Sequence, residues 1–294
     1  MTAPLSVART GRGDPLLLLH GMGSSRRDFT SVVPQLSVSF DVLNVDLPGS
    51  GSSAHLPRRP TVAAITDAVE RTLDAEQVGR VHVLGNSLGA RVALELARRG
   101  RARSVVAIAP SGLNVLPERL YQGGGMALAR VALRAAAPLI EPLTRSVVGR
   151  AALLAPLKAR PWSASADEGV GAREGFADSR DYWRTLLWGL MLDVPRGLDR
   201  IDCPVTLVQG VMDWVASGQT ARFLPLIPGS QFRPLVLAGH APQSDRPRTI
   251  VRLVEETARR AVPDPVAAAA VDGVTATPLR SGRRTGTARS TSLR

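Results

Sequence analysis

Cysteine is nearly absent from this chain, since Cys203 is the only one in 294 residues. A single cysteine excludes an intramolecular disulfide framework and a metal site built from several thiolates. Cys203 precedes the apolar run Val205 to Val208, and no histidine lies near it in sequence. We therefore predict a buried structural thiol rather than a nucleophile.

Lysine is equally scarce, because Lys158 is the only one among 37 basic residues. The formal net charge of +12 invites a nucleic-acid interpretation. The arginines are scattered along the chain, however, and no nucleic-acid-binding module is recognisable. A codon bias toward arginine explains the excess more simply, so no nucleic-acid partner is expected.

Long apolar runs are also missing. The start, Met1 to Arg9, lacks the charged and apolar segments of a signal peptide. A spanning helix needs roughly 18 or more apolar residues, and the apolar stretch from Met126 to Ile140 is interrupted by Arg130, Arg134 and Pro138. We expect a cytoplasmic protein with no stable membrane insertion.

What the chain does contain is a regular alternation of short apolar runs and longer helical patterns. Such alternation predicts βαβ units, and hence an α/β fold with a mostly parallel, doubly wound sheet. The expected strands are Leu16–Leu19, Phe40–Asp46, Val81–Leu84, Ser104–Ala109, Val205–Val208 and Phe232–Leu237, and the expected helices are Thr61–Gln77, Leu88–Arg99 and Pro247–Arg260.

The alternation breaks between Leu113 and about Pro195, where the pattern is helical and rich in Ala, Leu and Arg. We predict a core of residues 1–112 and 196–262, and a helical insertion, 113–195, packed over one end of the sheet. Residues 263–294 are poor in large apolar side chains, which predicts a disordered basic tail.

The strongest motif is Gly85-Asn86-Ser87-Leu88-Gly89. It matches G-x-S-x-G between a strand and a helix, the context in which this pattern forms a nucleophile elbow. A sharp turn there exposes the Ser87 hydroxyl, and the glycines allow the close backbone approach that the turn requires. The helix that follows directs free N–H groups and a positive dipole end toward Ser87. The alternative is a glycine-rich turn with a capping serine.

A serine hydroxyl needs a base to remove its proton, and the chain has four histidines, at positions 20, 55, 82 and 240. His82 lies within a strand and His55 in a polar loop. His240 follows the last predicted strand. Because loops after parallel strands gather at one edge of the sheet, His240 can meet Ser87. We predict His240 as the base, the alternative being a polar loop residue.

The base needs an acid that orients it and stabilises its charged form. Asp213 follows the strand Val205–Val208, and its position gives the order Ser, Asp, His. Asp202 precedes that strand and would lie at the wrong edge, whereas Asp193 lies in the insertion. The alternative for Asp213 is a turn-forming carboxylate.

The developing oxyanion needs two donors. We expect the backbone N–H of Leu88 and that of Met22, in the loop His20-Gly21-Met22-Gly23 after the first strand. This glycine-rich loop matches neither G-x-x-x-x-G-K-[ST] nor G-x-G-x-x-G, which argues against phosphate binding.

Together these motifs resemble the α/β-hydrolase superfamily, in its HGxG esterase and C–C hydrolase branch. The segments Asp46–Gly51, Gly210–Val215 and Gly239–Gln243 resemble the family's loop, acid and histidine segments, over roughly residues 5 to 260. The resemblance implies that Asp46 holds a loop, and that the insertion is a cap. The family usually opens with a β-hairpin, whereas only Leu5 to Thr10 precedes Gly11 here, so one edge strand is expected to be short or missing.

The resemblance implies a serine hydrolase that cleaves a carboxylic ester, thioester or lactone of a small apolar substrate through an acyl-enzyme, with no metal or organic cofactor. The expected substrate-contacting residues are His20, Gly21, Trp183, Trp188 and Trp214. A C–C bond hydrolase of ring-cleavage diketones remains an alternative, since Asn86 and Pro110–Leu113 resemble that subgroup. A cofactor-free lyase, peroxidase or acyltransferase that uses the same three residues is a further alternative. A non-enzymatic ligand receptor is another. The sequence leaves the oligomeric state open.

Overall fold

Seven strands form a single sheet in the order β1-β3-β2-β4-β5-β6-β7, and every neighbouring pair except β1 and β3 is parallel. The computed structural model describes residues 3–216 and 218–262, apart from the side chains at 137, 140, 141, 177 and 178. The strands are β1 (Val7–Thr10), β2 (Asp14–Leu19), β3 (Phe40–Val45), β4 (Val81–Asn86), β5 (Ala102–Ile108), β6 (Val205–Gly210) and β7 (Gln231–Leu235). The predicted α/β class and mostly parallel sheet are confirmed.

The first edge strand, left in doubt by the sequence, is present but short. β1 has four residues and pairs antiparallel with β3, with Val7 opposite Val45 and Thr10 opposite Val42. The turn after it contains Gly11 and Gly13, both with positive φ, where a Cβ would meet the backbone of residues 37–40.

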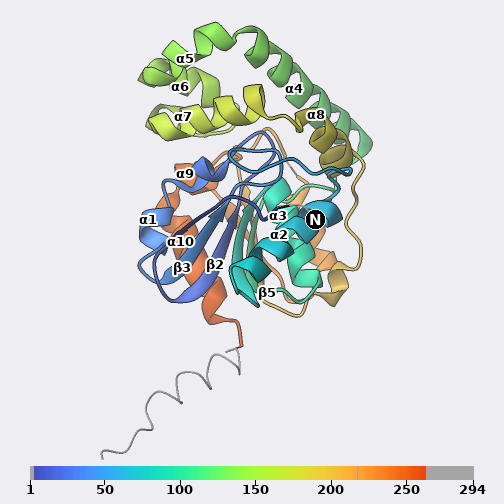
Figure 1. Cartoon of the computed structure of the whole chain (residues 1–294). Coiled ribbons are helices and arrows are strands. Elements are labelled where there is room, and N and C mark those ends of the chain that lie inside the picture. Colours follow the sequence, from blue (N-terminus) through green and yellow to red (C-terminus); the bar gives the residue numbers. More distant parts are fainter. Residues whose placement is uncertain (1–2, 217, 263–294) are drawn as a thin grey trace, which may run out of the picture. The chain divides into compact units, whose positions relative to one another are not determined.

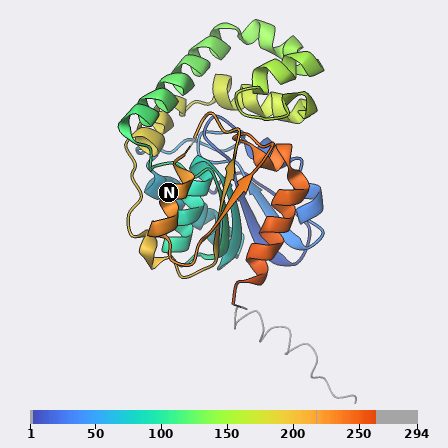
Figure 2. The same cartoon turned by 180° about the vertical axis from the view of Figure 1, so that it is seen from behind.

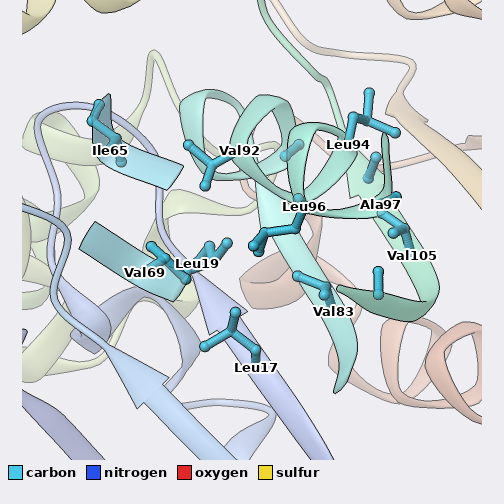
Figure 3. Close-up of a cluster of buried hydrophobic side chains, with 14 of the residues drawn as sticks. Leu17, Leu19, Ile65, Val69, Val83, Val92, Leu94, Leu96, Ala97 and Val105 are labelled. Atoms are coloured by element: carbon cyan, nitrogen blue, oxygen red, sulfur yellow. The ribbon is translucent and has the colours of Figure 1, made fainter. Parts of the chain in front are cut away.

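Helices cover both faces of the sheet, as Figure 1 shows. On one face lie α2 (Val62–Ala75) and α3 (Leu88–Arg98), and on the other α1 (Val33–Leu36) and α10 (Pro247–Arg259). Because side chains alternate along a strand, β2 sends Leu17 and Leu19 toward α2 and α3 (Figure 3). Leu16 and Leu18 belong to the second core, with α10. The apolar run in β2 is thus buried on both faces, as a central parallel strand requires.

The segment between β5 and β6 is largely helical, and most of it lies over the carboxyl ends of the strands (Figures 1 and 2). We call residues 113–195 the cap. It contains α4 (Leu116–Ala135), α5 (Ala137–Arg145), α6 (Val147–Leu154), η2 (Pro161–Ser163), α7 (Ala166–Arg173), η3 (Glu174–Asp178), α8 (Tyr182–Thr185) and η4 (Leu186–Met191).

The cap packs around Tyr182, whose ring is 1% exposed. Its hydroxyl donates to the carbonyl of Met126 in α4 at 2.8 Å, and the Arg130 guanidinium stacks 4.9 Å from its ring centre. Burial raises the pKa of this phenol, which therefore stays protonated. Tyr182 thus joins α8 to α4, the first helix of the cap.

The described residues up to Ala261 form one compact unit. The division of this unit at residues 112 and 195 remains a prediction, and the predicted basic tail lies outside the described residues. Within residues 3–216 and 218–262, no helix is long and apolar enough to cross a membrane. Cys203 is buried, which raises the pKa of its thiol to about 11, as expected for an inert side chain.

Candidate active site

The residues singled out from the sequence come together at the carboxyl edge of the sheet. Ser87 directly follows β4, Asp213 follows β6 and His240 follows β7. The loop that starts at His20 follows β2, the neighbour of β4. The chain leaves β2 toward β3 on one side and returns to β4 on the other, so this is the point where a doubly wound sheet opens a crevice.

Ser87 has the strained backbone that the elbow motif predicts. Its φ is +54° and its ψ is −113°, outside the conformations that non-glycine residues favour. The turn is possible because Gly85 and Gly89 are glycines: a Cβ at position 85 would lie 2.5 Å from the carbonyl oxygen of Gly89, and one at position 89 would overlap the backbone of Leu19. This turn places Ser87 directly before α3, whose first N–H groups have no partner within the helix and whose positive dipole end lies at the serine.

His240 and Asp213 form a buried hydrogen-bonded pair. Nδ1 of His240 lies 2.9 Å from Oδ2 of Asp213, and the two residues are 7% and 4% exposed. The carboxylate also accepts N–H groups of Val215 and Ala216 at Oδ1, at 2.8 and 2.9 Å, and the amide of Gln209 at Oδ2, at 2.8 Å. Since the carboxylate only accepts, Nδ1 carries the proton, and Nε2 is left free to take one.

The pKa values of the two residues are shifted in opposite directions by their contact. Burial raises the pKa of Asp213, but the attraction and hydrogen bond of His240, together with the bonds from Ala216 and Gln209, outweigh it and lower the pKa to about 2. Burial lowers the pKa of His240, yet the charge and hydrogen bond of Asp213 outweigh it, so the pKa lies above 6.5. Asp213 thus stays charged, and His240 is a stronger base than an isolated imidazole.

His20 does not line the cavity, which corrects the expectation that it contacts substrate. It is 1% exposed, its Nδ1 donates to the carbonyl of Gly21 at 2.7 Å, and its Nε2 accepts the N–H of Leu47 at 2.9 Å. Burial lowers its pKa, in keeping with a neutral ring. His20 therefore fixes the loops after β2 and β3 to each other. Asp46 does the same by accepting the N–H groups of Arg26 and Ser52.

The loop held by His20 lies against Ser87. A Cβ added to Gly21 would lie 3.3 Å from Cβ of Ser87. Gly21 and Met22 both line the same cavity as Ser87. Leu88 is the first residue of α3, so its N–H has no partner within the helix. The two backbone segments expected to supply oxyanion donors are therefore on either side of the serine.

A cavity of about 310 Å³ lies between this edge of the sheet and the cap, and both Ser87 and His240 line it. Its cap side is largely apolar, with lining residues from α4 and α6 that include Tyr121, Met126, Ala129, Leu133, Leu153 and Leu154. Three charged residues, Asp28, Lys158 and Glu168, also line it.

Of the expected substrate-contacting tryptophans, only Trp214 lines the cavity. Trp183 is 50% exposed, and Trp188 lies under the guanidinium of Arg59, 4.1 Å from its ring centre. Both belong to the last turns of the cap, and neither lines the cavity. The aromatic residues that do line the cavity besides Trp214 are Tyr121 and Phe176. Composition could not distinguish them, because every aromatic residue of an insertion has the same prior chance of lining a cavity.

Asp245 is a residue that sequence reasoning missed. Its carboxylate accepts the N–H of Gly239 at 2.8 Å, and those of Ala159 and Arg160 at 2.9 and 3.1 Å. The N–H of Ala241 donates to the carbonyl of Leu157 at 3.1 Å. The cap segment after α6 is therefore fastened to the backbone on both sides of His240. The sequence offered one signal for this role, an acid shortly after the histidine. In the structure this acid lies in α9 (Pro242–Asp245) and is buried.

Comparison with known proteins agrees with this geometry. Residues 16–253 match the model of the Alpha/beta hydrolase family. The chain belongs to this family. A curated relative, the pimeloyl-[acyl-carrier protein] methyl ester esterase of Chromobacterium violaceum, is 30% identical over 259 residues, which are 86% of this chain and 97% of that protein.

Two further similarities place this alpha/beta hydrolase among its relatives. Epoxide hydrolase EphH of Mycobacterium tuberculosis is 31% identical over 204 residues, 65% of this chain and 92% of that protein. Among solved structures, that of a membrane phospholipase A has a TM-score of 0.71 at 20% identity, covering 89% of this chain and 86% of that one. The structural likeness shows the fold, and the relatives support hydrolase activity.

Proposed function

We propose that this protein is a serine carboxylic ester hydrolase, with Ser87 as nucleophile, His240 as general base and Asp213 as the acid that orients His240. The observation that supports the proposal most is the hydrogen bond of 2.9 Å between Nδ1 of His240 and Asp213, because it leaves Nε2 as the nitrogen that can take a proton, and His240 lines the same cavity as Ser87. A charged acid, a neutral base and a strained serine at a helix start are the parts that acyl transfer needs.

In the first half of the reaction, Nε2 of His240 takes the proton from the Ser87 hydroxyl as the oxygen attacks the ester carbonyl. The resulting oxyanion accepts hydrogen bonds from the N–H groups of Met22 and Leu88. His240 then gives the proton to the leaving alcohol. An acyl group stays on Ser87, and Asp213 stabilises the transient imidazolium.

In the second half, water occupies the place of the alcohol. His240 removes a proton from it, the hydroxide attacks the acyl carbonyl, and the proton returns to Ser87 as the acid leaves. The apolar side of the cavity, between α4 and α6, fits a small apolar acyl group. The name of the Chromobacterium violaceum relative, a methyl ester esterase, agrees with ester hydrolysis. We therefore propose a small molecule as the substrate. We propose no nucleic-acid partner and no stable membrane insertion for the protein.

The test is labelling of Ser87 by a fluorophosphonate probe, with p-nitrophenyl butyrate hydrolysis by the wild type and Ser87→Ala. We expect labelling of the wild type alone and a fall in kcat of roughly 10⁴ to 10⁶ in the variant. An unlabelled Ser87, or unchanged turnover in the variant, contradicts the proposal. Turnover of a dienoic diketone without turnover of esters would assign the same three residues to C–C bond hydrolysis instead.

A further inference from the structure

One side of the active-site cavity is charged. Lys158 lies in the cap segment after α6, Glu168 in α7 and Asp28 in η1 (Arg26–Phe29). The side chains of Lys158 and Glu168 are 2% and 10% exposed, and all three residues line the cavity with His240. We call these three residues the polar niche. Withdrawing charges from water costs several kcal/mol for each ion, so their place in a largely apolar cavity needs a reason.

Attachment of the cap to the core does not by itself explain the niche. The segment that carries Lys158 is already fastened by backbone groups, since Asp245 accepts the N–H groups of Ala159 and Arg160 and the carbonyl of Leu157 accepts the N–H of Ala241. The side chains of Lys158 and Glu168 add contacts with the Ser244 hydroxyl in α9, but these backbone bonds hold the segment without them. An apolar side chain at this position would be compatible with the same attachment.

The choice of lysine is also informative. This is the only lysine among 37 basic residues, and an ammonium is a compact point charge where a guanidinium is a wide planar fork. Its Nζ donates to both carboxylate oxygens of Glu168, at 3.2 and 3.3 Å, and to the hydroxyl of Ser244. The two oxygens of one carboxylate lie too close together to take separate N–H groups of a tetrahedral ammonium, so one N–H is shared between them. Of the three N–H groups, the partners found in the described part of the chain then leave one for a ligand.

Asp28 supplies the complementary acceptor. Its Oδ1 accepts the hydroxyl of Ser24 at 2.5 Å, and among the described residues no hydrogen-bond donor pairs with Oδ2. Burial raises the pKa of Asp28, and the nearby Glu168 acts in the same direction, whereas His20 and His240 lower it. With one cation and two carboxyl groups, the niche disfavours an anionic ligand. A hydroxyl group, which both donates and accepts, suits an ammonium beside a carboxyl.

The position of the niche tells which part of the substrate it meets. His240 hands its proton to the leaving group, so the leaving oxygen must lie beside its imidazole. The N–H of Ala241 donates to the carbonyl of Leu157, so Lys158, the next residue, lies beside the His240 segment. Asp28 and Glu168 line the same cavity as His240. The niche is therefore on the leaving-group side, and the apolar surfaces of α4 and α6 remain for the acyl group.

We infer that the leaving group is a polyol, so that the substrate class is monoesters of a polyol with an apolar acid; this rests on the ester hydrolase function proposed above. A free hydroxyl of the polyol accepts a hydrogen bond from Lys158 and donates one to Asp28. Lys158 is thereby a specificity-determining residue that the cap contributes to the active site.

The test compares glyceryl monobutyrate with propyl butyrate, which carries the same acyl group on an alcohol without the extra hydroxyls. We expect the wild type to have at least tenfold higher kcat/KM for the glyceryl ester. Because a hydrogen bond to a charged group contributes about 1.5–3 kcal/mol, Lys158→Met should lower that preference about tenfold or more. Arg160→Met is the matched control: it removes a nearby exposed cation that does not line the cavity, and the preference should stay.

A wild type without preference for the glyceryl ester, or a Lys158→Met enzyme with an unchanged preference, overturns the inference. An equal loss of kcat/KM on both esters in Lys158→Met also overturns it, because Lys158 would then have a purely structural role. If Lys158→Met does not fold, Asp28→Ala tests the acceptor half and should lower the same preference. Fluorophosphonate labelling of Ser87 in each protein keeps the two proposals apart, because an unlabelled wild type means that the hydrolase function itself has failed.

Discussion

Asp213 and His240 are 27 residues apart in sequence, yet Oδ2 of one lies 2.9 Å from Nδ1 of the other. The pair is built from the loops after two neighbouring parallel strands, β6 and β7. Four donors bind the Asp213 carboxylate, and three of them do not come from His240. The orientation of the carboxylate therefore does not depend on the charge of His240. The imidazole consequently presents one defined nitrogen to the cavity.

Replacing Asp213 by Asn should lower kcat by roughly 10³ to 10⁴, because the amide can hold His240 in the wrong tautomer. The measurement is kcat for p-nitrophenyl butyrate with circular dichroism as a check on folding. Asp202→Asn is the control, since Asp202 lies before β6 with its side chain 72% exposed, and it should keep the wild-type rate. Equal rates in the two variants would remove Asp213 from the mechanism.

The pH dependence of kcat/KM should show an acid limb with an apparent pKa above 6.5. His240 acts as a base only when neutral, and Asp213 raises its pKa, so activity is lost as pH falls through that raised value. In Asp213→Asn the cause of the increase is gone, and the limb should move to lower pH. A wild-type limb below 6.5 would contradict the assignment of His240 as the base.

Asp245→Asn should reduce kcat by about tenfold with little change in KM, and should lower Tm. The new amide has one acceptor oxygen, so it cannot serve both the N–H groups of Gly239 and Ala159, which bond to Oδ2, and that of Arg160, which bonds to Oδ1; a buried group left unpaired costs about 1–3 kcal/mol. The rate of Ser87 labelling by a fluorophosphonate should fall in parallel with kcat, since His240 is mispositioned. The exposed Asp199→Asn serves as control. A lower Tm with unchanged labelling would limit Asp245 to a structural role.

Gly125 and Gly124 offer a matched pair in α4. Gly125 lines the cavity and Gly124 does not, and a Cβ at either position would meet nothing within 4 Å. Leucine at either site should favour the helix by a similar amount, about 1 kcal/mol. Only Gly125→Leu should fill the cavity, raising KM for p-nitrophenyl octanoate more than for the acetate. An identical chain-length profile in the two variants would show that the acyl group lies elsewhere.

Local sequence predicts the elements that carry the chemistry. The G-x-S-x-G elbow, the strands before it and the helix α3 follow from short-range rules: apolar runs, glycine where no Cβ fits, and helix periodicity. The expected helix Thr61–Gln77 is observed as α2, with Val62, Ile65, Val69 and Leu73 buried. Chain order and the edge rule for parallel strands also placed Asp213 and His240 at the edge where the structure has them.

Only the tertiary structure decided how the cap contributes to the site. Of the three tryptophans expected to contact substrate, only Trp214 lines the cavity. His20 does not line it either, because backbone groups occupy both of its ring nitrogens. Lys158, Glu168 and Asp28 meet because three segments distant in sequence pack together. A helix's apolar pattern specifies that one face is buried, but the partner of that face depends on long-range packing, which no local pattern of residues encodes.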